Sequence, residues 1–112
     1  MFITKFSDLL NGKVSLGSRS RSPQWTNVRR KFLKEHPKCV VCGSTQNLNV
    51  HHIKPYHLHP ELELEESNLI TLCENYKKGI HCHLLVGHLG DYRKINPQCI
   101  EDSQIWNSKL KD

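Results

Sequence analysis

The two cysteines of the segment CVVCG, residues 39–43, constrain this chain more than any other feature. Cys39 and Cys42 have two residues between them and Gly43 follows, a spacing that lets one turn wrap two thiolates around one ion. A second pair, Cys73 and Cys82, lies farther along the chain with eight residues between its members. Four thiolates suit a closed tetrahedral Zn²⁺ site with Zn–S bonds of about 2.3 Å. We therefore expect a structural zinc site.

Two alternatives stand beside this zinc site. The wide second pair leaves room for His81 in place of Cys82, and free cysteines can also pack as small apolar side chains. Zinc is favoured because a chain of 112 residues with 37% hydrophobic residues can bury only a small hydrophobic core. Binding of a metal ion would add to the stability of the folded state. The fifth cysteine, Cys99, is expected to be an ordinary packed thiol.

The rest of the composition bears on the compartment. The sequence has no run of about 18 apolar residues, so we expect no transmembrane helix. The N-terminal segment MFITKFSDLLNGK lacks a basic region followed by a continuous apolar stretch, and we infer no secretory signal. We expect a cytoplasmic protein, in which five cysteines favour metal binding over disulfides.

Charge is unevenly distributed along the chain. Residues 1–38 hold nine Lys and Arg against two acidic residues, whereas residues 39–112 hold seven basic and nine acidic residues. A basic N-terminal part followed by a nearly neutral C-terminal part favours binding to a polyanion. The plainer alternative is that these charges only keep a small protein in solution.

The first part of the chain divides into an arm and a helix. Residues 1–21 read as an N-terminal arm followed by a basic, Gly- and Ser-rich linker. Ser22 can cap a helix that has Pro23 at its first position, and Pro37 ends it. Trp25 and Phe32 share one face, with Trp25 expected in the core. Four basic residues lie mostly on the other faces and are the candidate phosphate contacts: Arg29, Arg30, Lys31 and Lys34.

Shorter elements follow. LNVHHI (residues 48–53) and NLITLC (68–73) predict two strands separated by a long loop, and HCHLLVGHLG (81–90) predicts a short helix. The tail predicts a closing helix that carries Ile100, Trp106 and Leu110. Glu63 and Glu65 alternate with leucines, which favours the solvated face of a strand edge over metal binding.

Histidines are frequent, eight in all, and two of them are adjacent at the end of the first predicted strand. Neighbouring side chains on a strand point to opposite faces, so His51 and His52 are expected to divide two tasks, one binding a metal and the other acting as a base. His83 and His88 are five residues apart, a little past ideal helical spacing, so the end of their helix must relax for both to reach one ion.

The segments CVVCG, VHHIKP, NLITLC and CHLLVGH together resemble the HNH endonuclease motif, the ββα-metal fold of bacterial and phage nucleases. The motifs span residues 39–88, and the flanking segments resemble small HNH proteins of phage genomes. The resemblance implies an α+β fold: a small single domain over residues 22–112, built around a ββα motif at about 39–90, with a structural zinc site and flanking helices.

The resemblance also implies roles, position by position. His52 takes the place of the general base, and Asn68 the place of the asparagine that binds the loop backbone and so orients the base. The catalytic ion would be held by His51 and His83, with His88 as a possible further ligand. The paired knuckles of the family fall on the four cysteines Cys39, Cys42, Cys73 and Cys82. Many members have Asp where this chain has His51, and an imidazole there favours Mn²⁺, Ni²⁺ or Zn²⁺, although Mg²⁺ stays open.

The expected function is therefore metal-dependent hydrolysis of DNA phosphodiester bonds, by nicking or double-strand cutting. The resemblance further implies a phage-encoded protein linked to DNA packaging, with terminase or portal proteins as partners. The alternative is a catalytically silent zinc-binding module or packaging adaptor. Such a protein would keep the four cysteines without needing His52 or Asn68.

Overall fold

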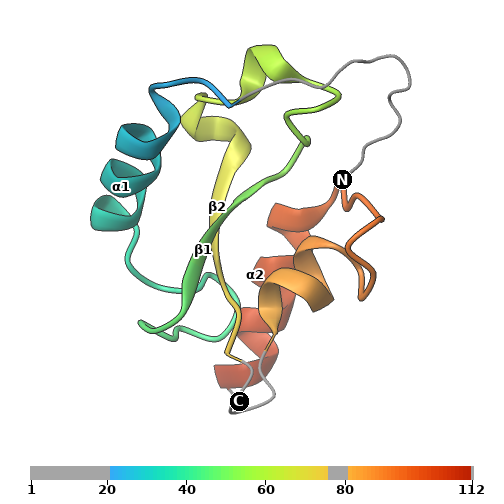
Figure 1. Ribbon diagram of the computed structural model, residues 1–112. Helices are drawn as coiled ribbons and strands as arrows, with labels where there is room; N and C mark the ends of the chain where they lie inside the picture. Colours follow the sequence, from blue (N-terminus) through green and yellow to red (C-terminus); the bar gives the residue numbers. More distant parts are fainter. Residues whose placement is uncertain (1–20, 76–80, 112) are drawn as a thin grey trace.

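The computed structural model describes residues 21–75 and 81–111, and Figure 1 shows how their elements are arranged. The arm and linker expected over residues 1–21 lie outside the described residues, apart from Arg21. Among the described helices, none has the length and apolar character that crossing a bilayer requires.

Two antiparallel strands form the centre of the domain. β1 (Leu48–His52) pairs with β2 (Leu69–Cys73), with Leu48 opposite Cys73 and His52 opposite Leu69. Every residue of β2 is buried, as its run of apolar and β-branched residues predicts for a strand covered on both faces. Both predicted strands are confirmed to within one residue at their ends.

Helices lie on either side of this hairpin (Figure 1). α1 (Trp25–Glu35) packs against β1 and buries Phe32, and it ends before Pro37 as expected. It begins two residues later than predicted. The Ser22 hydroxyl oxygen accepts the N–H of Gln24, and the Ser22 carbonyl accepts the N–H of Trp25. Ser22 therefore closes a turn ahead of the helix rather than capping it.

The loop between the strands contains two short 3₁₀ helices, η1 (Pro60–Leu62) and η2 (Glu66–Asn68). The prediction of a strand edge from the alternating Leu and Glu residues is wrong. Glu65 is exposed, but only 6% of Glu63 is exposed, because the loop turns its carboxylate back toward the residues before α1.

After β2 the chain forms a π-helical turn, η4 (His83–Gly87), and then helix α2 (Cys99–Lys111). The closing helix is confirmed, and it packs on η4, which contacts both strands. Cys99 is fully buried, as expected of a packed thiol, whereas Ile100, Trp106 and Leu110 are exposed. The side-chain amide of Asn107 donates to the carbonyl of Val41, which ties α2 to the cysteine knuckle.

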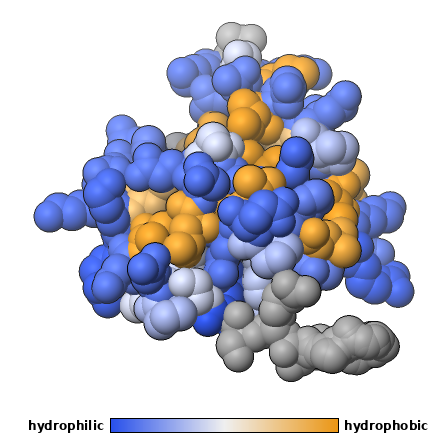
Figure 2. Space-filling view, turned by 90° about the horizontal axis from the view of Figure 1, so that it is seen from above, coloured by the Kyte–Doolittle hydropathy of each residue, from blue (hydrophilic) through white to orange (hydrophobic). Residues whose placement is uncertain are grey.

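A single small core joins these layers, and the expected α+β fold class is confirmed. Its fully buried members include Leu72, Cys73 and Cys99, and Val41, Ile53 and Val86 pack around them. Hydrophilic residues cover most of the face seen from above, with separate apolar patches between them (Figure 2).

Candidate functional site

Four cysteines meet where β2 ends. The Sγ atoms of Cys39, Cys42, Cys73 and Cys82 all lie within 4.8 Å of one another, and those of Cys42 and Cys73 are 3.5 Å apart. Four thiolates bound to one Zn²⁺ at about 2.3 Å are separated by roughly 3.8 Å in a tetrahedral arrangement. None of the four forms a disulfide. The cluster fits a structural zinc ion, with Cys82 in the group as predicted.

The backbone brings these thiols together from three elements. Gly43 has a φ of 79°, and its N–H donates to the carbonyl of Cys39, closing the knuckle with a turn that favours glycine. The N–H of Val40 donates to the carbonyl of Thr71, which fastens the knuckle to β2. Cys73 is the last residue of β2 and Cys82 directly precedes η4. An ion here ties the knuckle, the sheet and η4 into one unit.

The thiolate form is favoured at Cys39. A sulfur hydrogen bond from Cys82 holds the pKa of Cys39 well below its usual range, with backbone N–H groups adding to the effect and burial opposing it. Burial raises the pKa of Cys73 to about 11, and the hydrogen bond to Cys39 raises the pKa of Cys82. Metal ligands must be deprotonated, so the thiolate forms of these two residues need the charge of a bound cation.

Three histidines form a second cluster. His83 Nε2 lies 3.1 Å from His51 Nδ1 and 3.2 Å from His88 Nε2. Imidazole nitrogens that share one ion at 2.0–2.1 Å lie roughly 3 to 3.4 Å apart, depending on the angle at the ion. Burial lowers the pKa of His51 to about 3, and the neighbouring imidazoles act in the same direction, so this ring is neutral near pH 7.

The outer nitrogens of two of these rings face oxygen acceptors. His83 Nδ1 lies 2.6 Å from the carboxylate of Glu74, and His88 Nδ1 lies 2.9 Å from the carbonyl oxygen of Lys94. An acceptor at Nδ1 places the proton there and leaves the Nε2 lone pair directed at the cluster. Two lone pairs that converge at 3.2 Å repel each other unless a cation lies between them. This donor set fits a divalent metal ion.

The π-helical turn explains how His83 and His88 reach one point. The two residues are five positions apart, which is close to the repeat of a π-helix, whereas an α-helix would rotate the second ring away. Gly87 suits the same turn, because a Cβ there would lie 3.1 Å from Leu72 and 3.3 Å from the imidazole of His51 and would press on both side chains. The relaxation expected of this helix extends through the whole turn.

His52 faces away from the three-histidine cluster, as the alternation of a strand predicts. Its Nε2 lies 2.9 Å from the carbonyl oxygen of Glu63, and its ring lies against the indole of Trp25 with centroids 4.5 Å apart. Trp25, expected in the core, is half-buried at this site instead. Because a carbonyl only accepts, Nε2 donates and Nδ1 keeps a lone pair. Burial lowers the pKa of His52, with the charge of Arg21 acting in the same direction and the Glu63 carbonyl opposing.

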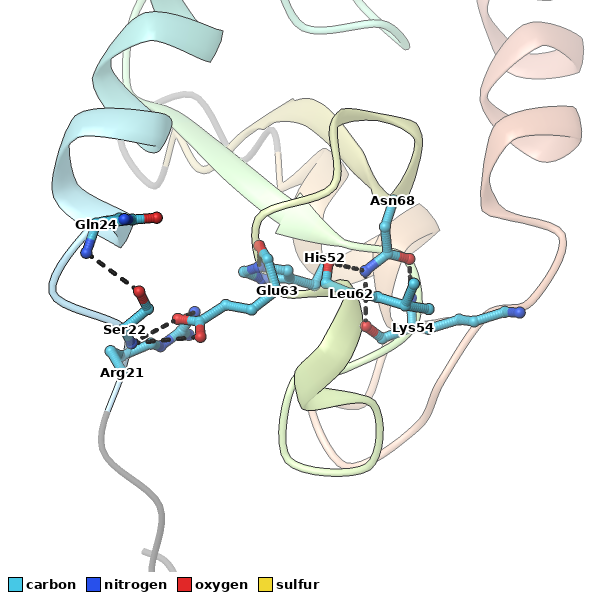
Figure 3. Close-up of polar contacts among 8 residues, drawn as sticks. All are labelled: Arg21, Ser22, Gln24, His52, Lys54, Leu62, Glu63 and Asn68. Atoms are coloured by element: carbon cyan, nitrogen blue, oxygen red, sulfur yellow. Dashed lines mark hydrogen bonds and ion pairs between the residues drawn. The ribbon is translucent and has the colours of Figure 1, made fainter.

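Asn68 closes the loop that carries the Glu63 carbonyl. Its side-chain oxygen accepts the N–H of Lys54, and its amide donates to the carbonyls of Lys54 and Leu62 (Figure 3). Only 6% of Asn68 is exposed. The residue therefore fixes both ends of the loop and holds the peptide next to Glu63.

The Glu63 side chain adds a second anchor. Its two carboxylate oxygens lie 3.3 and 3.2 Å from the N–H of Ser22, and Arg21 Nη1 lies 3.8 Å from the second (Figure 3). The guanidinium of Arg21 also lies over the rings of Tyr56 and Trp25, at 4.1 and 5.1 Å. The segment before α1 is thus joined to the loop that holds His52.

The basic residues of α1 lie on the helix that carries Trp25. Arg30, Lys31 and Lys34 are exposed and Arg29 is half-buried. Lys31 is already paired, with its Nζ 3.2 Å from Glu35 and 3.3 Å from Glu66. Arg30 donates to the side chain of Asn27.

Sequence reasoning missed three residues of this site. Glu63 looked like a surface residue because it alternates with leucines, and its partner, the backbone N–H of Ser22, is far away in the sequence. Glu74 had one usable signal, its position directly after Cys73. Tyr92, whose hydroxyl donates to Glu74 and whose ring lies 5.2 Å from that of His88, had none.

Residues 39–88 match the family model described as HNH endonuclease. The matched segment begins at the first cysteine of the knuckle and ends at His88, so it contains both clusters together with His52 and Asn68. The comparisons with curated proteins and with solved structures give no match.

Proposed function

We propose that this chain is a metal-dependent enzyme that hydrolyses phosphodiester bonds in DNA, because residues 39–88 match the HNH endonuclease family model. The observation that carries the proposal is the pair of histidines at the end of β1. One imidazole joins a cluster of three, and the next is held as a neutral base by a backbone carbonyl. A zinc module that only bound DNA would need neither arrangement.

His52 is the general base. With Nε2–H donated to the carbonyl of Glu63, its Nδ1 takes a proton from the attacking water while the water oxygen bonds to phosphorus. The bond from phosphorus to the 3′ oxygen breaks, and that oxygen takes a proton from solvent water, leaving 5′-phosphate and 3′-hydroxyl ends. Asn68 serves this step by fixing the loop that holds the ring.

His51, His83 and His88 would hold one divalent ion, from Mg²⁺, Mn²⁺, Ni²⁺ or Zn²⁺. When bound, it supplies Lewis-acid stabilisation for the charge on the phosphoryl and leaving oxygens. Three imidazole ligands favour the borderline ions among these over Mg²⁺. The separate thiolate cluster would hold zinc in a purely structural role.

Binding of the DNA backbone is assigned to α1. Its basic residues Arg29, Arg30, Lys31 and Lys34 share the rigid element that packs on β1 beside His52, and contacts to phosphates carry no base readout. We infer little intrinsic sequence preference. A phage-encoded enzyme in the bacterial cytoplasm, acting with terminase or portal proteins, stays a prediction supported by the resemblance of the flanking segments.

The test is cleavage of supercoiled plasmid by the zinc-loaded protein, with EDTA, Mg²⁺, Mn²⁺ and Ni²⁺ in parallel. The wild type is compared with His52→Ala and with His57→Ala, a matched change at an exposed loop histidine. We expect metal-dependent cleavage by the wild type and by His57→Ala. His52→Ala should cleave roughly 10²–10⁴-fold more slowly while binding DNA normally.

Near-normal cleavage by a folded His52→Ala protein would remove the general-base assignment. DNA binding without cleavage under any of the ions would overturn the proposal that the protein is an enzyme and would favour the catalytically silent zinc module or packaging adaptor.

A further inference from the structure

We propose that Glu74 is a positioning residue of the histidine cluster, which fixes the tautomer of His83 and strengthens its binding to a divalent ion. The inference deepens the proposed function, since it concerns the ion that this function requires. It rests on the contact between Glu74 Oε1 and His83 Nδ1, at 2.6 Å.

The contact is formed inside the protein rather than on its surface. Side-chain exposure is 11% for Glu74 and 18% for His83, so water competes weakly with the interaction. The same Glu74 oxygen accepts a hydrogen bond from the hydroxyl of Tyr92. A carboxylate that accepts from two donors stays in place, and its charge raises the basicity of the ring that it faces.

The tautomer follows from this geometry. A neutral imidazole has one N–H and one lone pair, and a carboxylate oxygen can only accept. The proton of His83 is therefore on Nδ1, and the lone pair of Nε2 points toward His51 and His88 at 3.1 and 3.2 Å. Without Glu74, the proton could move to Nε2 and block the atom that must bind the ion.

The thiolate cluster holds this pair from both sides. Glu74 directly follows Cys73, and His83 directly follows Cys82. In each of these two pairs of neighbouring residues, the cysteine belongs to the zinc site and the other residue belongs to the carboxylate–histidine pair. The backbone positions of both partners are fixed by the same four-cysteine group. Zinc in that group would keep the carboxylate aligned with the ring.

The experiment measures ion binding by the zinc-loaded protein, with Ni²⁺ as the probe and calorimetry as the readout. Glu74→Ala is compared with Glu74→Gln and with Glu65→Ala, a change at an exposed carboxylate of the loop. His51→Ala identifies the titrated site, and zinc content reports whether each variant keeps its thiolate cluster. Long-range ¹H–¹⁵N spectra of the imidazoles report the tautomer of His83 before Ni²⁺ is added.

We expect Glu74→Ala to weaken Ni²⁺ binding by about 10–100-fold, as is usual when the carboxylate partner of a metal-binding histidine is removed. Glu74→Gln should lose less, because its amide oxygen still accepts from Nδ1. Glu65→Ala should bind as the wild type does. In the wild type His83 should carry its proton on Nδ1, and in Glu74→Ala this preference should disappear.

An Nε2–H tautomer of His83 in the wild type would overturn the inference, and so would an affinity of Glu74→Ala within twofold of the wild type. Absence of Ni²⁺ binding to the wild type would overturn it as well. If Glu74→Ala loses its zinc, the wild-type tautomer and Glu74→Gln decide the matter. A wild type that binds Ni²⁺ through this cluster but leaves DNA intact would sink the proposed function and leave this inference standing.

Discussion

The carbonyl oxygen of Glu63 lies 2.9 Å from Nε2 of His52, and the carboxylate of the same residue accepts the backbone N–H of Ser22. One residue therefore joins the candidate base to the segment that precedes α1. The carbonyl sets which nitrogen of His52 carries the proton, and the buried carboxylate sets where that carbonyl lies. The geometry of the base depends on a contact between distant parts of the chain.

Loss of the Glu63 carboxylate should slow cleavage without weakening DNA binding. Glu63→Ala removes the acceptor of Ser22 N–H and the partner of Arg21, so the loop loses its anchor and the His52 ring its fixed direction. Misplacement of a catalytic group by about 1 Å can cost up to 10²-fold in rate, and we expect a loss of at least about tenfold. Single-turnover cleavage and fluorescence anisotropy measure the two effects.

Two variants bracket this result. Glu63→Gln keeps an oxygen that can accept from Ser22 and should retain more activity than Glu63→Ala. Glu65→Ala removes an exposed carboxylate two residues away and should behave as the wild type. Equal cleavage rates for Glu63→Ala and Glu65→Ala would contradict the anchoring role.

Asn68→Asp tests the other anchor of the loop. The change is nearly isosteric, but it turns the amide that donates to Lys54 and Leu62 into a carboxylate facing two carbonyl oxygens. A buried group left without its hydrogen bonds costs about 1–3 kcal/mol, so thermal unfolding of the zinc-loaded protein should shift downward. Cleavage should fall as well. Gln46→Glu, the same amide-to-carboxylate change at an exposed position away from α1, is the control. Similar stability and activity for the two variants would dismiss the role of Asn68.

Local patterns were enough to predict the strands and both long helices. NLITLC is apolar and β-branched, and it forms the fully buried β2. Pro37 limits α1, and the four cysteines indicated the cluster that the chain forms. These features depend on residues close in the sequence or on residue types with one dominant chemistry, so they could be inferred from the sequence alone.

Features that depend on distant contacts could not be predicted. Glu63 is buried because residues 21 and 22 lie over it, and its alternation with Leu62 and Leu64 indicated a surface instead. The π-helical turn is another case, because five-residue spacing of His83 and His88 is unremarkable until Gly87 packs against His51 and Leu72. The sequence indicated which rings belong together but not the helix type that joins them.

Removal of one thiolate should unfold the domain. Cys42→Ser leaves three thiolates around zinc, and the knuckle, β2 and η4 lose their common attachment. We expect loss of bound zinc, measured by mass spectrometry under native conditions, together with loss of the cooperative unfolding transition. Cys99→Ala is the control, since Cys99 is a buried cysteine that lies outside the cluster. Full zinc content in Cys42→Ser would show that this residue is not a ligand.

Two lysines of α1 should differ in what they contribute to DNA binding. Lys34 is exposed and has no carboxylate within ion-pair distance in the part of the chain that the structure describes, whereas Lys31 is paired with Glu35 and Glu66. A compensated charge contributes less to the release of counterions from DNA. Lys34→Ala should therefore weaken binding more than Lys31→Ala, and it should reduce the slope of log K against log salt by about 0.9, the value for one phosphate contact.

Alanine is a good helix former, so α1 should be kept in both variants. Anisotropy titrations between about 50 and 200 mM salt, in a His52→Ala background that leaves the DNA intact, give both quantities. An unchanged salt slope in Lys34→Ala would move the phosphate contacts away from this end of α1.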